Sequence, residues 1–186
     1  MDRFLDFSFL DNTVQSYLLV IATILLAVLL KRFVSRYIAG LLFRLVKRTA
    51  RGVEKQTFVN LVISPLEIFL VILVTIIAIE KLNFPSILDF TTYRISFQKL
   101  METLSIIILV IAFTWLLLRI IDFIATLLEQ KANLTDDPSN NQLVVFFKDF
   151  FKVLIVIIGV LMVLKFGFSF QISSLITGLS IAGAAI

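Results

Sequence analysis

The sequence predicts an all-α integral membrane protein with about five transmembrane helices per subunit, and three observations carry this prediction. Hydrophobic residues make up 60% of the 186 residues, and only 16% are charged. The mean hydropathy is +1.05. A soluble domain of this size could not bury so much apolar surface. Apolar runs approaching the ~20 residues that cross a bilayer recur several times, so lipid and neighbouring helices must surround them.

The first span is expected over residues 14–30, between an acidic segment and a basic one. Residues 1–13 carry Asp2, Asp6 and Asp11 against one Arg, which is the wrong flank for a cleavable signal peptide. We expect this segment to be an external N-terminal tail. Residues 31–57 hold eight basic residues against Glu54 alone, which is typical of a cytoplasmic loop. The N-terminus is therefore predicted to lie outside.

The remaining spans follow because successive spans alternate in direction. Residues 14–131 are expected to hold the first three transmembrane helices, with spans at 58–79 and about 103–118 joined by an external loop broken at Pro85. Residues 132–165 would form the next loop and the fourth helix, with its span at 143–164. Residues 166–186 would form an external turn and the start of a fifth, inward-directed helix.

Two stretches of the chain resemble each other at a separation of roughly 84 to 88 positions. "YLLVIATILLAVLLKRFVSRYIAGLL" is similar to "IIILVIAFTWLLLRIIDFIATLLEQ", and "KLNFPSI" is similar to "KFGFSFQI". An internal duplication of a two-helix hairpin is one explanation. Chance similarity between two hydrophobic helices that end in Arg is the other.

The basic segment after the first span has an apolar face if it is helical, because its apolar residues recur at steps of three and four from Phe33 to Val46. Such a helix would lie on the inner leaflet and bind lipid headgroups. The alternative is an ordinary positive-inside loop that only sets topology. The residues expected to contact headgroups are Lys31, Arg32, Arg36, Arg44, Lys47, Arg48 and Arg51.

A few charged residues interrupt the apolar runs. Glu67 follows Pro65, which could end an interfacial helix and start the second span, so a position near the inner surface is favoured over an ion route through the membrane. Arg119 and Asp122 stand three residues apart and could bridge. Lys148, Asp149 and Lys152 could bridge in the same way. All of these charges are interpreted as anchors at the cytoplasmic edge.

The sequence excludes most catalytic chemistry. It has no Cys and no His, which removes thiolate and imidazole metal ligands, Cys or His catalysis and disulfides. It also lacks a Gly-rich phosphate loop, a nucleophile elbow and a basic surface with interleaved aromatics for nucleic acid. We therefore expect no enzyme activity, no metal, no cofactor and no nucleic-acid partner.

The final segment differs from the other spans because it is rich in small residues rather than in Leu, Ile, Val and Phe. Small residues let helix backbones approach closely, which suits a ring of pore helices built from several copies. A small-residue face such as Gly178 to Ala182 could instead hold a plain dimer or an intramolecular bundle. The chain stops within this apolar run, so we expect it to be cut inside a helix. The residues assigned to pore lining and packing are Ser174, Leu175, Thr177, Gly178, Leu179, Ser180, Ile181, Ala182, Gly183, Ala184, Ala185 and Ile186.

The last twenty residues, "GFSFQISSLITGLSIAGAAI", resemble the loop and first half of the pore-lining helix of the MscS-like small-conductance mechanosensitive ion channels. The resemblance implies an external turn at Gly167, a homoheptamer with one such helix per subunit, and a cytoplasmic domain that is absent from this chain. Ala184 stands where the family has its first sealing Leu, and Ser180 and Ile181 replace Gly and Ala. The gate would then lie at Ile186, at a residue beyond it, or be formed in a different way. The matching residues are Gly167, Ser174, Leu175, Ile176, Leu179, Ala182, Gly183 and Ala185.

The resemblance therefore predicts a channel opened by membrane tension that relieves osmotic pressure in a plasma membrane, with a bacterial inner membrane as the expected location. No charge occurs in residues 172–186, so weak selectivity is expected for the permeating ions and small solutes. The lipid bilayer and further copies of the chain would be its partners. The rival hypotheses are a secondary transporter or flippase that uses Glu67 or Lys152, and a noncatalytic membrane scaffold.

Overall fold

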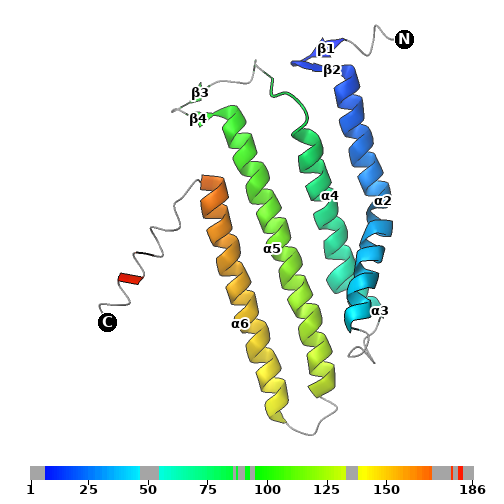
Figure 1. Ribbon diagram of the computed structural model, residues 1–186, viewed down its shortest axis with the longest axis vertical. Helices are drawn as coiled ribbons and strands as arrows, with labels where there is room; N and C mark the ends of the chain where they lie inside the picture. Colours follow the sequence, from blue (N-terminus) through cyan, green and yellow to red (C-terminus); the bar gives the residue numbers. More distant parts are fainter. Residues whose placement is uncertain are drawn as a thin grey trace.

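The computed structural model describes residues 7–46, 55–85, 87, 91–92, 95–132, 138–168, 177 and 180–181. Its architecture is a set of four long helices that run antiparallel in chain order (Figure 1). They are α2 (Val14–Val46), α4 (Ser64–Ile79), α5 (Phe97–Ala132) and α6 (Pro138–Met162). The short helix α3 (Lys55–Phe58) and the π-helical segment η1 (Val59–Ile63) lead directly into α4, and a second π-helical segment, η3 (Val163–Gly167), continues α6.

Among the residues that the structure describes, four helical segments are long and apolar enough to cross a membrane, which confirms four of the expected spans. They are Val14–Ile38, Val59–Ile79, Phe97–Gln130 and Gln142–Gly167. The expected fifth span lies outside the described residues, apart from Thr177, Ser180 and Ile181. These four helical segments are compatible with a multi-pass membrane protein whose described spans are all helical.

Two of the helices are longer than a bilayer requires. At 1.5 Å per residue, the 36 residues of α5 extend for about 54 Å, against about 30 Å of hydrocarbon. The 33 residues of α2 extend for about 50 Å. Both helices must therefore tilt strongly or continue beyond the hydrocarbon.

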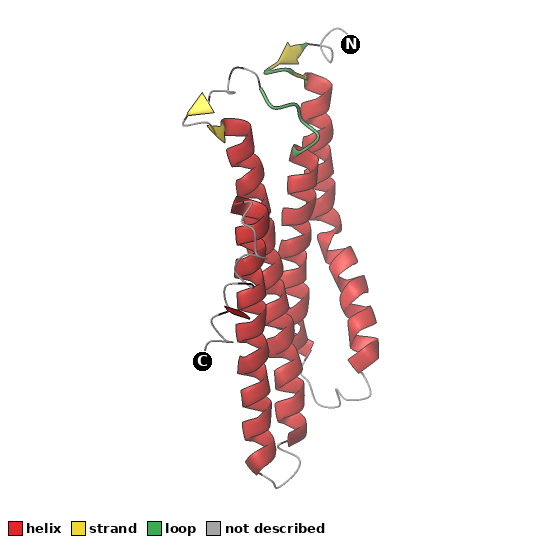
Figure 2. Cartoon of the chain, turned by 60° about the vertical axis from the view of Figure 1, so that its left-hand side comes forward, coloured by secondary structure: helices red, strands yellow, loops and turns green. Residues whose placement is uncertain are grey.

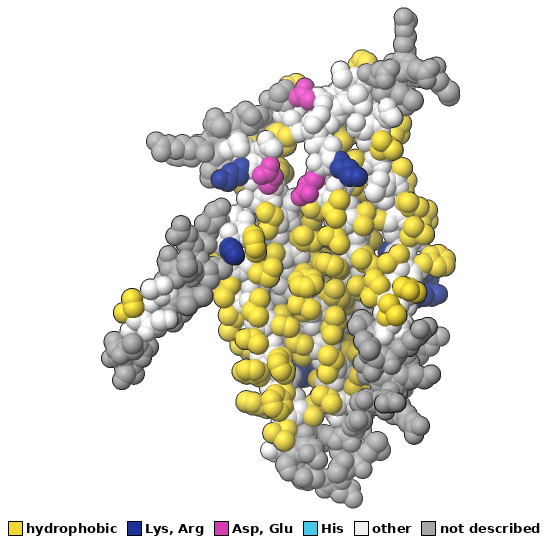
Figure 3. Space-filling model, in the orientation of Figure 1, with side chains coloured by type: hydrophobic (Ala, Val, Ile, Leu, Met, Phe, Trp, Pro, Cys, Tyr) yellow, Lys and Arg dark blue, Asp and Glu magenta, His cyan; other side chains and the backbone are white. Residues whose placement is uncertain are grey.

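The helices pack in chain order, with α2 on α4, α4 on α5 and α5 on α6. Little of the helix surface is buried within the chain. In the most apolar 18-residue stretch of each span, only 11% to 22% is buried. Hydrophobic side chains cover the helices on the face shown in Figure 3. A small core forms where η1 meets α5, from Val62, Phe123 and Leu127. The rings of Phe58 and Phe123 meet there edge to face, with centroids 5.2 Å apart.

A two-stranded antiparallel sheet precedes each of the two longest helices, and Figure 2 shows both at the same end of the molecule, which we call the hairpin end. Strands β1 (Ser8–Phe9) and β2 (Asn12–Thr13) lead into α2, and strands β3 (Thr91–Thr92) and β4 (Ile95–Ser96) lead into α5. The order of β-hairpin, long helix and antiparallel second helix thus occurs twice, as β1–β2, α2 and α4 and again as β3–β4, α5 and α6. This order agrees with the duplication that the sequence similarity suggests.

The turn between β1 and β2 is made by two residues that both have positive φ, Leu10 at 49° and Asp11 at 61°. A two-residue hairpin turn of this geometry matches the natural twist of the strands and usually contains Asn or Gly. Leu is an unusual choice, because its Cβ crowds the following carbonyl oxygen in this conformation. The hairpin therefore tolerates a local conformational cost at Leu10.

Several expected boundaries need correction. The segment 31–46 is not a loop but the continuation of α2, and residues 47–54 lie outside the described residues. Pro65 does not separate two helices: η1 runs directly into α4, and its wider turn accommodates a proline that lacks an N–H. The fourth span begins at Gln142, one residue before the expected start. The helix that contains it, α6, begins earlier, at Pro138, in the first-turn position that proline favours.

Candidate functional site

The predicted pore helix lies largely outside the described residues. Thr177, Ser180 and Ile181 are helical and exposed, and Ser174, Leu175, Gly178, Leu179, Ala182, Gly183, Ala184, Ala185 and Ile186 are not described. Their assignment to a pore therefore stays a prediction.

Gly167, expected in an external turn, is the last residue of η3 and is buried. A Cβ at this position would lie 3.1 Å from Ile107 Cγ1 of α5, so the absence of a side chain allows close helix packing. The fourth helix is thus longer than the sequence suggested, and any turn must follow it.

The residues expected to contact lipid headgroups are described in part. Lys31, Arg32 and Arg36 lie on α2, and the two arginines are exposed. Phe33 follows Arg32 and Tyr37 follows Arg36, and their side chains are 73% and 72% exposed. Aromatic and basic side chains together are typical of a helix at a membrane–water interface. Arg44 lies on the same helix with its side chain undescribed, and Lys47, Arg48 and Arg51 lie outside the described residues.

Glu67 occupies the α2–α4 interface and contacts a fully buried hydroxyl. Ser35 has no exposed surface, and its Oγ lies 2.5 Å from the backbone oxygen of Lys31 and 3.2 Å from Glu67 Oε1. One hydroxyl hydrogen is thus shared between a carbonyl and a carboxylate oxygen. The contact joins α2 to α4 within the spans Val14–Ile38 and Val59–Ile79. Because η1 runs directly into α4, Glu67 lies eight residues past the start of its span, and its expected position near the inner surface stays a prediction.

Charged side chains also join α5 to α6, but with partners other than those expected. Asp122 pairs with Lys152 at 2.5 Å, and Glu129 lies 3.8 Å from Lys148. Arg119 does not pair with Asp122; its guanidinium lies 5.8 Å from the centre of the Trp115 ring, in a cation–π contact. The two ion pairs thus join α5 to α6, whereas the Arg119–Trp115 contact runs along α5.

Helices α5 and α6 approach each other closely at Gly159. A Cβ placed there would lie 2.6 Å from Thr114 Oγ1, which is shorter than any ordinary contact. An apolar groove of about 400 Å³ includes this crossing, because Thr114 and Gly159 both line it, and a second apolar groove of about 310 Å³ follows the helix pair beyond it. Beside the second groove, Phe146, Phe147, Phe150 and Phe151 form a stacked aromatic cluster on α6. All four rings are exposed, as lipid-facing side chains would be.

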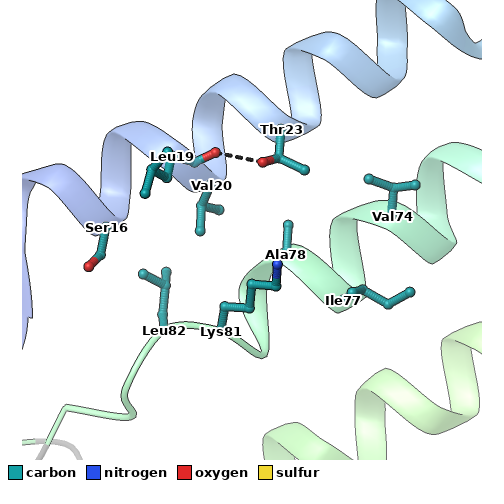
Figure 4. Close-up of a pocket in the computed structure, with 9 residues that line it drawn as sticks. All are labelled: Ser16, Leu19, Val20, Thr23, Val74, Ile77, Ala78, Lys81 and Leu82. Atoms are coloured by element: carbon teal, nitrogen blue, oxygen red, sulfur yellow. Dashed lines mark hydrogen bonds between the residues drawn. The ribbon is translucent and has the colours of Figure 1, made fainter.

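A cavity of about 330 Å³ separates α2 from α4 at the hairpin end (Figure 4). Six of its lining side chains are apolar and three are polar. Thr23 donates its hydroxyl to the backbone oxygen of Leu19 at 2.7 Å, so it adds little polarity to the cavity. Lys81 has no ion-pair partner among the described residues. The lining consists of Ser16, Leu19, Val20, Thr23, Val74, Ile77, Ala78, Lys81 and Leu82.

Next to this cavity, Asn12 clamps the first hairpin to the end of α4. Its side-chain amide donates to the backbone oxygen of Asn83 at 2.7 Å, and its side-chain oxygen accepts from the Asn83 backbone N–H, also at 2.7 Å. Asn12 is only 5% exposed. The side-chain amide thus replaces a strand partner for one residue of the loop after α4.

Sequence reasoning identified Glu67 and Lys152 but missed the Asn12–Asn83 clamp and the cavity. In the sequence, only polar residues near the ends of two apolar runs could have indicated the clamp and the cavity. That these two ends lie side by side is known only from the three-dimensional structure. Within the described part of the chain, no group of acidic side chains is arranged to hold a metal ion. Compared with protein-family models, curated proteins and solved structures, the chain matches none of them.

Proposed function

We propose that this protein is a subunit of a mechanosensitive ion channel opened by membrane tension. The observation that carries the proposal is the resemblance of residues 167–186 to the first half of an MscS-like pore helix. In the proposed orientation the N-terminus and the hairpin end lie outside, and the segment after α6 re-enters the membrane from that side.

The packing of the described helices supports this proposal. No more than 22% of the most apolar 18-residue stretch of any span is buried within the chain. Most of the helix surface is therefore left to contact lipid or other subunits. Tension favours the state with the larger in-plane area, and a loosely packed, lipid-exposed set of helices can couple to that change. Assembly of several copies would place the small-residue helices around a common axis.

The α5–α6 hairpin is the element suited to transmit such a change to the pore helix. Its two helices are held together by the Asp122–Lys152 pair and by the close approach at Gly159. Gly167 packs on Ile107 immediately before the pore segment. A hairpin fixed in this way would move as one body and pull the following residues with it.

Patch-clamp recording under graded suction, with the protein reconstituted in liposomes, tests the proposal. We expect weakly selective, stretch-activated currents. G183L should abolish or strongly alter them, because a bulky side chain would separate the proposed pore helices. G40A is the matched control, since a Cβ at Gly40 on α2 has no atom within 4 Å. Suction that evokes no current from protein shown to be folded would refute the channel.

The second candidate, a secondary transporter, is favoured by one contact. A carboxylate that shares the hydrogen of a fully buried serine between two spans is the kind of group that proton-coupled carriers use. In that case E67Q would abolish gradient-driven solute flux, whereas the channel proposal predicts tension-activated currents that persist in E67Q.

A further inference from the structure

We propose that the cavity between α2 and α4 is a binding site for one anionic phospholipid, which inserts an acyl chain between the helices and places its phosphate at Lys81. This inference does not rest on the channel proposal, because a lipid site in the first helix pair is compatible with any function of the chain. The lining residues, which are mostly apolar with a lysine at one end, favour an amphiphilic ligand.

The lining forms a groove with two matched walls. On α2 the residues follow each other at steps of three and four from Ser16 to Thr23, and on the other wall they do so from Val74 to Lys81, which lies in the turn after α4 ends at Ile79. The α2 wall therefore presents one continuous helix face over eight residues, with a rise of roughly 10 Å. In Figure 4 Val20 of α2 and Leu82 after α4 point toward each other across the opening.

The polarity of this groove changes along its length. Ser16 and Lys81 lie at the hairpin end, and the walls below them are aliphatic, apart from a Thr23 hydroxyl that is already bonded to the backbone. A free phosphate ion would gain nothing from six apolar side chains. An acyl chain beneath a phosphate fits both parts, because its methylenes leave water while its charge stays at the interface.

Charge complementarity selects an anionic headgroup. Lys81 is exposed at the end of α4 and has no ion-pair partner among the described residues. Figure 4 shows its side chain running beside Ala78 at the edge of the cavity. Ser16 adds a hydroxyl, which already exchanges a 2.9 Å hydrogen bond with Thr13 and can still take part in a second one. An ammonium near a lipid surface favours an anionic lipid by about five-fold.

The walls of the site are held in place before a ligand arrives. The two bonds between Asn12 and the Asn83 backbone fix the loop after α4 to the hairpin that precedes α2. Ala78, only 2% exposed, lets the two helices approach closely beside the cavity. A preformed site loses little conformational freedom on binding, which favours one resident lipid over transient contacts.

Photo-crosslinking of the full chain tests the proposal. The protein would be placed in phosphatidylcholine nanodiscs containing a minor fraction of phosphatidylglycerol with a diazirine in its acyl chain, and the labelled residues would be mapped by mass spectrometry. We expect several-fold more labelling at Val20, Thr23 and Val74 than at Leu18 and Ile21, which are exposed on other faces of α2. A phosphatidylcholine probe should label the cavity less.

Two matched variants decide the roles of charge and shape. K81Q should lower cavity labelling about five-fold, whereas K99Q, which removes an exposed lysine from the same end of α5, should leave it unchanged. T23L should fill the inner part of the cavity and exclude the chain, while amide exchange in α2 and α4 shows that the fold is intact. Equal labelling of Val20 and Leu18, an equal effect of K99Q, or competition by inorganic phosphate would each overturn the proposal.

Discussion

The Lys152 ammonium of α6 lies 2.5 Å from the Asp122 carboxylate of α5, within two segments apolar enough to span a membrane. Both side chains are partly shielded, with exposed fractions of 30% and 21%. A charge in such a place is tolerated because the opposite charge and its hydrogen bonds replace the lost water. The pair links α5 to α6, and loss of one partner would leave an uncompensated charge in a shielded position.

Removing either Asp122 or Lys152 should destabilise the packing of α5 against α6. D122N leaves the Lys152 ammonium without its counter-charge, and we expect it to lower the free energy of unfolding by about 1–3 kcal/mol. E129Q is the control, because the Glu129–Lys148 pair is longer at 3.8 Å, and its loss should cost less than about 1 kcal/mol. Unfolding in mixed detergent micelles measures both. Equal losses in the two variants would contradict the assigned role of Asp122.

A methyl group at Gly159 should push α5 and α6 apart. G159A places a carbon 2.6 Å from Thr114 Oγ1, and the overpacking should cost about 1–3 kcal/mol. T114A removes the clashing oxygen and methyl, so the double variant G159A/T114A should recover part of this loss. A double-mutant cycle of unfolding free energies measures the coupling.

The control for that cycle is G40A, at a helical glycine with no atom within 4 Å of an added Cβ. It should be neutral or stabilising by up to about 1 kcal/mol, because alanine has the higher helix propensity. A destabilising G40A, or a G159A that behaves like it, would contradict the packing described for α5 and α6.

The clamp at the hairpin end should depend on the Asn12 side chain. N12A removes both bonds to the backbone of Asn83, an exposed residue whose freed groups water can reach, so the cost should be about 0.5–1.5 kcal/mol. Amide hydrogen exchange at Asn83 should accelerate, because its donor bond is lost. Q15A, at an exposed position on the first turn of α2, should leave that exchange unchanged.

The orientation of the helices can be tested directly, because the chain contains no cysteine. A membrane-impermeant maleimide added to intact cells should label K99C and Q15C, which lie at the hairpin end, and should label Q142C only after permeabilisation. This result is expected because the basic segments lie at the opposite end and basic loops remain in the cytoplasm. The reverse pattern would place the N-terminus inside.

The sequence predicted the four described spans because each is a run of apolar residues long enough to cross hydrocarbon. The expected first span, 14–30, lies within Val14–Ile38, and the second, 58–79, nearly coincides with Val59–Ile79. The helix ends were less predictable. Lys31 and Arg119 mark where the apolar run stops, yet α2 and α5 continue to Val46 and Ala132, because a helix needs no membrane around it to propagate.

The sequence by itself determined the class of the protein and the number and approximate bounds of the described spans. These properties follow from local composition, because the free energy of transferring a segment from water to the membrane depends on the residues of that segment alone. Only the tertiary structure decided which polar groups meet. Asp122 pairs with Lys152 rather than Arg119, Ser35 meets Glu67 and Asn12 meets Asn83. Each of these contacts joins different helices or loops, so it depends on how the helices pack rather than on spacing along the chain.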